Sequence, residues 1–197
     1  MKINLFIISI IVVILTSYAC TQPDTTQSKK DIVLSAIHER KSVRSFIKER
    51  PISDEDITTL IKAGMAAPSG RNIQPWEFVI IKDRNTLDNM AKELPTAKML
   101  AEAPMAIVIC GDTVKSFYWY LDCAAATQNI LLAAEAMNLG GVWTASYPYR
   151  DRMDVVIKNT NMPSHILPLA VIPIGYPKGH HSAKDKYEEN KVHVDKW

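Results

Sequence analysis

The pattern of hydrophobic positions predicts helices and strands that alternate along most of the chain. Apolar residues at helical spacing predict helices over 31–40, 54–64, 83–94 and 151–159. Continuous apolar runs predict strands over 78–81, 104–110 and 166–175. A fifth helix is expected over 120–138, where nearly every face is apolar, and a helix of that kind is buried.

The helix over 120–138 is expected to be a packing centre. Its run Ala124-Ala125-Ala126 allows close packing against a second helix, including one from another subunit. The polar residues that interrupt it are expected to bond locally: Asp122, Gln128 and Glu135. Gly140 and Gly141 follow the helix, and they are expected to end it in the left-handed conformation.

The strand over 166–175 contains two prolines, Pro168 and Pro173. Proline lacks the N–H group that an interior strand donates to its neighbour. We therefore expect this strand to lie at a sheet edge or to begin late.

The first 20 residues have the pattern of a secretory signal. Met1-Lys2 leads into an apolar run over 3–15, and small residues follow up to Cys20. The run is shorter than the roughly 20 apolar residues that a membrane span needs. Ala19-Cys20 resembles the lipobox of bacterial lipoproteins, whose cysteine is acylated, although Ser17 and Tyr18 depart from that motif.

These features predict an exported chain that is tethered to a membrane on its periplasmic or surface side. The expected parts are a signal peptide over 1–20, a flexible polar tether over 21–30 and one domain over 31–197. Ordinary cleavage and an uncleaved anchor remain alternatives to lipidation of Cys20.

Composition narrows the class of function. The 197 residues are 47% hydrophobic and 22% charged, which suits one globular domain. The net charge of +2, without a stripe of lysine and arginine, does not indicate nucleic-acid binding. Cys20, Cys110 and Cys123 fit neither a disulfide framework nor a zinc spacing, and His180-His181 has no carboxylate at ligand spacing. Cys110 and Cys123 are expected in the core, and no metal site is expected.

One stretch is rich in residues that fix a loop. Residues 66–78, the 66–78 loop, read AAPSGRNIQPWEF. Pro68 and Pro75 stiffen its ends, Gly70 lets the backbone approach a partner, and the amides of Asn72 and Gln74 both donate and accept hydrogen bonds. The composition suits a loop that holds a flat polar group, and it equally suits an ordered turn that closes one face of a core.

A second stretch, RKSVRSF over 40–46, is the basic segment. Arg40, Lys41 and Arg44 supply positive charge, and Ser42 supplies a short neutral donor. These groups together can bind a phosphate. Taken alone, the stretch is also typical of a solvated basic surface patch.

Five segments in order resemble the FMN-dependent nitroreductase family. They are RKSVRSF, AAPSGRNIQPWEF, KMLAEAPMAIVIC, LGGVWTASYP, and LPLAVIPIGYP with the basic tail after it. The resemblance covers 32–197. It implies an α+β fold, in which helices flank a central, mainly antiparallel sheet. It also implies an intertwined homodimer with one FMN in each of two clefts at the subunit interface.

The resemblance implies which residues hold the cofactor. Arg40, Lys41 and Ser42 would hold the FMN phosphate and ribityl chain, together with the tail cations Lys184 and Lys186. Lys41 stands where arginine or histidine is frequent in the family.

The resemblance also assigns residues to the flavin ring. Arg44 and Lys98 would lie near its pyrimidine end and tune it electrostatically. The backbone of the segment Trp143-Thr144-Ala145 would meet N5 and O4, although many relatives have glycine in place of Ala145. Pro68, Ser69 and Gly70 would line the ring in the partner subunit, with Asn72 and Gln74 shaping the loop or contacting the cofactor.

The implied activity is transfer of hydride from NAD(P)H through flavin N5 to a nitroaromatic, quinone or other conjugated acceptor, in a ping-pong scheme. No side chain then has to act as a nucleophile or as an acid–base pair, because the flavin carries the chemistry. Nicotinamide cofactors are scarce outside the cytoplasm, so two alternatives remain. One is a flavin enzyme with other chemistry, such as reductive dehalogenation or enone reduction, and the other is a flavin-binding lipoprotein without turnover.

The acceptor would be selected by loops near 113–120 and 147–152. Their aromatic residues are Phe117, Tyr118, Trp119 and Tyr149. These rings either stack on a planar substrate or pack at the dimer interface.

Overall fold

The computed structural model describes residues 28–197. The expected signal peptide, Cys20 and most of the expected tether lie outside the described residues. The chain divides into two units, Met1–Ile32 and Val33–Trp197. Within 28–197, no helix is long and apolar enough to cross a membrane.

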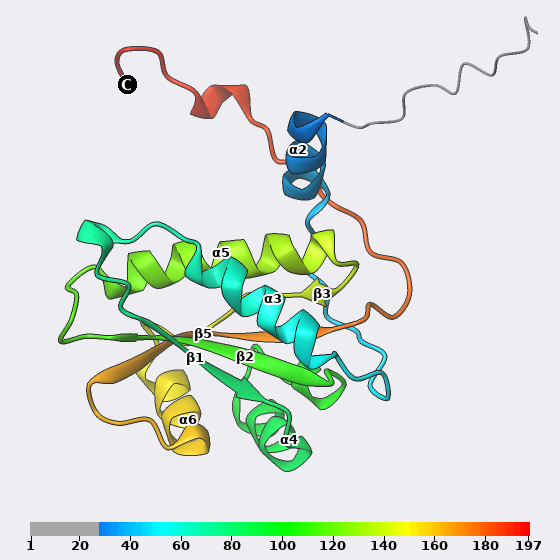
Figure 1. Cartoon of the computed structure of the whole chain (residues 1–197), viewed down its shortest axis with the longest axis vertical. Coiled ribbons are helices and arrows are strands. Elements are labelled where there is room, and N and C mark those ends of the chain that lie inside the picture. Colours follow the sequence, from blue (N-terminus) through cyan, green and yellow to red (C-terminus); the bar gives the residue numbers. More distant parts are fainter. Residues whose placement is uncertain (1–27) are drawn as a thin grey trace, which may run out of the picture. The chain divides into compact units, whose positions relative to one another are not determined.

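A five-stranded antiparallel sheet forms the centre of the second unit (Figure 1). The strand order is β1 (Trp76–Ile81), β2 (Met105–Asp112), β5 (Ile166–Gly175) and β3 (Gly140–Gly141), and β4 (Thr144–Ala145) also pairs with β5. Every pairing is antiparallel. The three predicted strands and the expected mainly antiparallel sheet are therefore confirmed.

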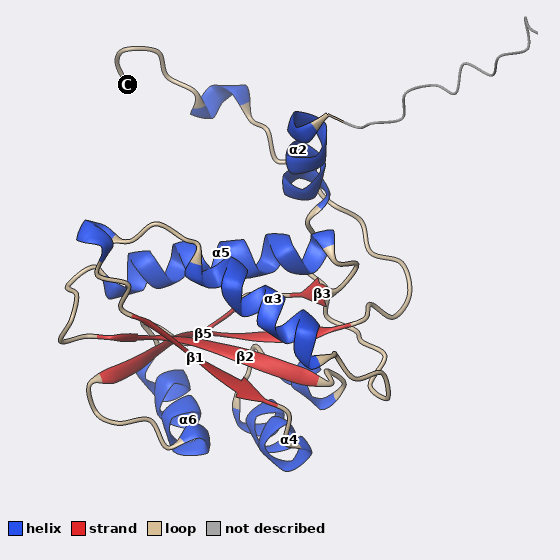
Figure 2. Ribbon diagram, in the orientation of Figure 1, coloured by secondary structure: helices blue, strands red, loops and turns tan. Residues whose placement is uncertain are grey.

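Helices cover both faces of this sheet (Figure 2). One face carries α3 (Asp54–Met65) and α5 (Trp119–Ala136), and the other carries α4 (Arg84–Glu93) and α6 (Arg150–Thr160). The structure also describes α2 (Lys29–Glu39) and three short 3-10 turns: η1 (Gly70–Asn72), η2 (Lys98–Ala101) and η3 (Glu189–Lys191). The five predicted helices are confirmed to within a few residues.

Strand β2 shows why its sequence reads as one continuous apolar run. All of its residues are buried. Successive side chains of a strand point to opposite faces, so Ile107 and Ile109 join the core under α3 and α5, while Ala106 and Val108 join the core under α4 and α6. A strand covered on both faces has no polar side.

The prediction that the proline-containing strand lies at a sheet edge or begins late is wrong, because β5 is central and begins at Ile166, before both prolines. Pro168 pairs with Cys110 at a shift in the register between β2 and β5. Pro173 lies opposite the interval between β3 and β4, where that side of β5 has no ladder pair. Each proline thus occupies a place where the ladder is interrupted on at least one side.

The expected end of the fifth helix is also corrected. Asn138, not a glycine, has the left-handed backbone, with a φ of 57°. Gly140 and Gly141 instead form β3. A Cβ on Gly140 would lie 2.6 Å from the Cβ of Val43, so this glycine makes room for a neighbouring side chain.

Candidate functional site

The basic segment is fixed against β3 through its backbone. Ser42 forms an isolated bridge with Gly141, and the Val43 N–H donates to the Gly141 carbonyl at 3.1 Å. Val43 is buried in the space beside Gly140, while Ser42 and Arg44 on either side of it are exposed. The backbone is thus anchored inward, and the side chains that can bind a ligand face outward.

The basic segment and the C-terminal tail line one pocket. The tail begins beside the segment, where the Lys178 N–H donates to the Ser45 carbonyl at 3.0 Å. A cavity of about 240 Å³, the cation pocket, is lined by Arg40, Lys41, Ser42, Arg44, Ser182, Lys184 and Lys186. Two groups of predicted phosphate ligands, from opposite ends of the domain, therefore meet at one place. Five cations and two hydroxyls make an anion-binding environment.

One cation of this pocket is already paired. The Lys41 ammonium lies 2.5 Å from a carboxylate oxygen of Glu135, near the end of α5, and both side chains are mostly buried. The expectation that Glu135 bonds locally is therefore wrong, because its partner is 94 residues away. The other four cations of the pocket form no salt bridge within the described residues.

The turn η2 packs against the inner side of the basic segment. Met99 contacts the small core formed by Val43, Phe46 and Ala103. The Lys98 ammonium, one residue earlier, donates to the Lys92 carbonyl at 3.0 Å and lines a separate hollow between α4 and η2. The structure brings the backbone beside Lys98 to the basic segment, but it does not place the ammonium in the cation pocket.

The guanidinium of Arg84 holds η2 in place, which the sequence did not suggest. It donates to the Ala103 carbonyl at 2.8 Å and to the Leu100 carbonyl, and it pairs with Asp88 at 2.9 Å. A charged donor to two carbonyls fixes the turn more firmly than a neutral one.

The segment Trp143-Thr144-Ala145 continues from β3 along the same edge. The Thr144 hydroxyl is buried and donates to the Val171 carbonyl at 2.6 Å, so its side chain is committed to the sheet. The Ala145 carbonyl accepts a bond from Arg152 at 3.3 Å. The Trp143 side chain is exposed. A ligand at this edge would meet backbone and the Trp143 ring, and not the Thr144 hydroxyl.

The 66–78 loop lies at the other end of α5. The Gly70 N–H donates to Oδ1 of Asp122 at 2.9 Å. Asp122 also accepts the nearby Ser116 hydroxyl, so the expectation that it bonds locally is confirmed, but the bond to Gly70 was not expected. The 13 residues from Asp122 to Glu135 span about 20 Å of helix at 1.5 Å per residue. The two groups of predicted flavin contacts are therefore held at opposite ends of one helix.

The backbone of the loop is unusual. Arg71, Asn72 and Gln74 have φ values of 52°, 56° and 53°, in a region that side-chain-bearing residues seldom adopt. The Gln74 N–H donates to the Ser69 hydroxyl, and the Gln74 side-chain amide donates to the Asn72 side-chain oxygen, both at 3.0 Å. Asn72 and Gln74 thus shape the loop, which is one of the two roles expected of them.

Gly70 is not explained by the chain that contains it. It does not have a positive φ, and a Cβ there would lie 3.9 Å from its nearest neighbours, Tyr118 and Asp122. Among residues 28–197, neither backbone conformation nor packing requires glycine at this position. The missing Cβ leaves room for a second molecule to approach the backbone closely.

The aromatic residues near the loop divide into two groups. Trp119 is buried and packs edge-on against Tyr147 at 5.0 Å, so it belongs to the core of this chain. Phe117 and Tyr118 are exposed and contact each other edge-to-face at 5.4 Å. Tyr149 is exposed beneath the guanidinium of Arg152.

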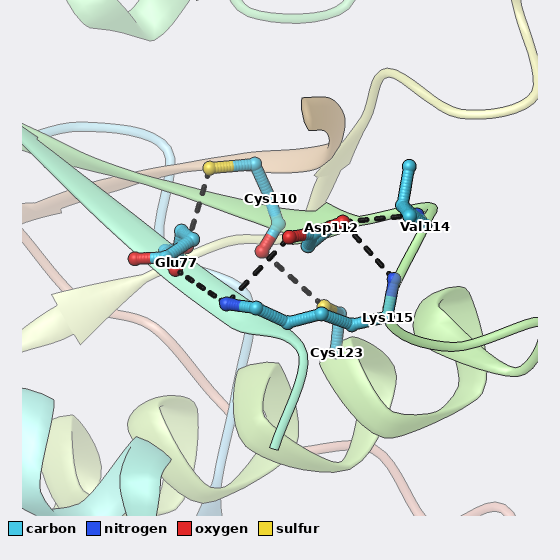
Figure 3. A network of polar contacts seen from close by, with 6 residues as sticks. All are labelled: Glu77, Cys110, Asp112, Val114, Lys115 and Cys123. Atoms are coloured by element: carbon cyan, nitrogen blue, oxygen red, sulfur yellow. Dashed lines mark hydrogen bonds and ion pairs between the residues drawn. The ribbon is translucent and has the colours of Figure 1, made fainter. Parts of the chain in front are cut away.

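A polar network at the end of β2 contains both described cysteines (Figure 3). Burial, aided by the charge of Glu77, raises the pKa of Cys110 to about 12, and burial raises the pKa of Cys123 as well. The Cys110 thiol donates to the Glu77 carbonyl at 3.2 Å, and the Cys123 thiol donates to the Cys110 carbonyl at 3.3 Å. Both cysteines lie in the core, as predicted, and their raised pKa values keep the thiols protonated.

The carboxylate of Asp112 closes this network. Burial raises its pKa, but N–H donation from Lys115 and Val114 outweighs that effect, so the pKa lies below its usual value. The Lys115 ammonium bridges Asp112 and Glu77 at 3.6 Å. Within 28–197, no group of three or more metal-binding side chains is present. The network stabilises the strand end and has no feature of a catalytic site.

The sequence of this chain is similar to those of a known protein family. The model of the Nitroreductase family matches residues 37–97 and 88–176. A relative from Archaeoglobus fulgidus, provisionally named an NADH dehydrogenase/NAD(P)H nitroreductase, is 40% identical over 171 residues, which cover 83% of this chain and 98% of the relative.

Solved structures have the same fold. A crystal structure from Bacteroides thetaiotaomicron with the same provisional name is 56% identical, has a TM-score of 0.82 and is matched over 84% of this chain and 98% of that one. The NADPH:FMN oxidoreductase of Vibrio harveyi, solved with NAD+, is 25% identical with a TM-score of 0.75, over 84% of this chain and 78% of that one. This chain therefore belongs to the nitroreductase family, as its sequence motifs predict.

Proposed function

We propose that this protein is an FMN-dependent oxidoreductase that takes hydride from NAD(P)H and passes it to a nitroaromatic, quinone or other conjugated acceptor. The observation that carries the proposal is the cation pocket, in which Arg40, Ser42 and Arg44 meet Lys184 and Lys186. A phosphate monoester with nearly two negative charges fits such a set of donors. Bound FMN would supply hydride transfer at N5.

The protein's own residues would bind and orient the ring. Arg44 lines the pocket beside Ser42, and it would supply positive charge to the reduced ring, where negative charge collects. Lys98 would join it if its ammonium left the Lys92 carbonyl. The Trp143-Thr144-Ala145 backbone lies next to the basic segment through Gly141, where it can meet the N5 edge.

A second copy of the chain would complete each site in an intertwined homodimer. The separation of the loop and the cation pocket along α5 supports this, because each chain then holds two half-sites. Uncovered apolar side chains support it as well. Helix α2 has no buried residue, and the tail exposes Tyr187, Val192, Val194 and Trp197. Large apolar side chains exposed together mark an interaction surface.

Two relatives bear on the electron donor and the acceptor. The name of the Vibrio harveyi protein gives both NADPH and FMN, and that structure contains NAD+. An iodotyrosine deiodinase from Thermotoga neapolitana is 28% identical over 180 residues, which cover 79% of this chain and 92% of the relative. Reductive dehalogenation is therefore the second candidate activity. Flavin binding without turnover is the third.

We propose that the domain acts outside the cytoplasm, attached to a membrane through an acylated Cys20. The apolar run and the Ala19-Cys20 ending support this location. Mass spectrometry of the membrane fraction tests it. A diacylated or triacylated cysteine at the new N-terminus is expected, and an unmodified N-terminus would contradict it.

An absorption spectrum tests the activity. The chain without residues 1–20 is purified and its bound flavin is measured, and NADPH and then NADH are added without oxygen. About one FMN per chain is expected, with bleaching by either nucleotide and recovery on adding a nitroaromatic or a quinone. A protein that stays colourless with excess FMN would overturn the proposal. If the flavin absorption recovers only with an iodophenol, dehalogenation is favoured. If dithionite bleaches the flavin and neither nucleotide does, another reductant or binding without turnover is favoured.

A further inference from the structure

The buried carboxylate of Asp122 joins two segments near the proposed flavin site. Its Oδ1 accepts the Gly70 N–H at 2.9 Å, and its Oδ2 accepts the Ser116 hydroxyl at 3.4 Å. The Ser116 hydroxyl oxygen in turn accepts the Tyr118 N–H at 3.1 Å. One side chain therefore connects the 66–78 loop with the turn that carries the exposed aromatic rings of Phe117 and Tyr118.

The 66–78 loop needs such an anchor because its backbone is strained. Three left-handed residues, Arg71, Asn72 and Gln74, are each unfavourable, and they persist only where the surroundings hold them. The bonds from Gln74 to Ser69 and Asn72 lie within the loop. They fix its shape, but they do not fix its place on the molecule.

Over residues 68–75, two hydrogen bonds join the loop to the rest of the domain. One is the Asp112 N–H to Pro75 carbonyl bond at 2.9 Å, at the start of β1. The other is the Gly70 N–H to Asp122 bond, at the strained end. Asp122 is buried in the first turn of α5, so its side chain is held in place by the helix and little water competes for this bond.

We propose that Asp122 is a positioning residue of the flavin site, which holds Pro68–Gly70 and the 116–118 turn in one fixed arrangement. This inference rests on the proposed function. The ring would then meet a preformed surface, and it would not have to order the loop at the cost of binding free energy. Asp122 itself touches neither cofactor nor substrate, so its effect would reach the ring only through Gly70.

Two conservative variants separate position from charge. Asp122→Asn removes the charge but keeps an oxygen in place to accept the Gly70 N–H. Asp122→Glu keeps the charge but moves the carboxylate by about 1.5 Å, one carbon–carbon bond. Positioning requires that Asp122→Asn bind FMN within threefold of wild type and that Asp122→Glu bind it at least tenfold more weakly. A purely electrostatic role requires the reverse order.

Hydrogen exchange of the Gly70 amide gives a readout that does not depend on FMN. Exchange should be at least tenfold faster in Asp122→Glu than in wild type, and near wild type in Asp122→Asn. The Asp56 amide, which donates to the Ser53 hydroxyl at the start of α3, serves as the unaffected reference. Asp83→Glu is the matched control, because the Asp83 carboxylate likewise accepts a backbone N–H, from Thr86 at 2.8 Å at the start of α4, and its lengthening should leave FMN binding within threefold.

The outcomes distinguish this inference from the proposed function. A wild-type protein that binds no FMN refutes the proposed function, and the role of Asp122 in the site falls with it. Wild-type binding with equal affinity in both Asp122 variants overturns the positioning role alone. Asp122→Ala also breaks the Gly70 bond, but it leaves space where glutamate adds bulk. It must weaken FMN binding and speed Gly70 exchange at least tenfold, and it replaces Asp122→Glu as the test if the glutamate variant does not fold.

Discussion

The two ends of α5 hold their segments by different physical means. At its C-terminal end, Glu135 pairs with the Lys41 side chain, and three cations of the pocket stand on exposed side chains: Arg44, Lys184 and Lys186. At its N-terminal end, a buried carboxylate holds a backbone amide of a strained loop. A phosphate needs charge, which flexible side chains can deliver from several directions. A planar ring needs a surface of fixed shape, which only ordered backbone provides.

Substitutions that disable the two ends of α5 in different chains should have the largest effect on activity. Ser42→Asp places a negative charge where the phosphate is expected, and Gly70→Val fills the space that the ring is expected to approach. Each variant alone should lose nearly all activity. A mixture should recover about a quarter of wild-type activity, because half of the dimers are mixed and one of their two sites is intact.

Co-expression with two different tags provides the mixed dimers for this measurement. The activity per chain of the doubly purified species should be about half that of wild type. If each site is built within one chain, every site in the mixture carries one damaged half, and activity stays at background. That result would contradict the placement of the 66–78 loop against the partner's flavin.

Substitution of the two tail lysines tests the cation pocket, at the C-terminal end of α5. Lys184→Ala with Lys186→Ala should weaken FMN binding by roughly 100-fold, since each charge-assisted bond to a phosphate contributes about 1.5 kcal/mol or more. Fluorescence quenching of FMN on titration measures this. Added salt should weaken wild-type binding more than binding by the double variant, because fewer charges remain to be screened.

Lys158→Ala is the matched control for charge. Lys158 is an exposed lysine of α6, and its one salt bridge within the described part of the chain is to Glu93, at 3.4 Å. Its removal should change FMN affinity by less than twofold. A similar loss in the control and in the tail variant would mean that net charge, and not the cation pocket, attracts the cofactor.

Substitution of one glycine near each end of α5 should have different effects on the free energy of unfolding. Gly140→Ala puts a Cβ 2.6 Å from Val43, which anchors the basic segment, so it should lower the free energy of unfolding by about 1–3 kcal/mol. Gly70→Ala meets nothing closer than 3.9 Å and should change it by less than about 0.5 kcal/mol. Urea unfolding of FMN-free protein measures both changes in the free energy of unfolding. Equal losses would mean that Gly70 is required by the chain itself.

Much of the fold follows from the sequence because its signals are local. The Ser53 cap, the acidic first turn of α3 and the apolar periodicity of α4 each lie within a few residues of the element that they specify. The joint role of the basic segment and the tail in holding a phosphate was predicted through their resemblance to a family. The structure adds that these two segments share one pocket.

What could not be predicted depends on contacts between residues far apart in the chain. Asp122 and Glu135 read as polar interruptions of an apolar helix, and only the packed fold reveals that they bond to Gly70 and Lys41. The central place of β5 was hidden in the same way. A proline in a strand is compatible with the middle of a sheet when the neighbouring strand is broken opposite it, and sequence does not show that break.

The smallest expected effect belongs to Glu135, whose charge opposes that of the cation pocket. Glu135→Gln should release Lys41 toward the phosphate and tighten FMN binding about threefold, whereas it should lower the free energy of unfolding by about 1 kcal/mol, because the mostly buried pair is broken. Lys41→Met should lower stability similarly but weaken FMN binding. The opposite signs for FMN distinguish a cation that serves the ligand from one that serves only the helix. If both variants leave FMN affinity unchanged, Lys41 belongs to α5 alone, and the phosphate depends on the four other cations of the pocket.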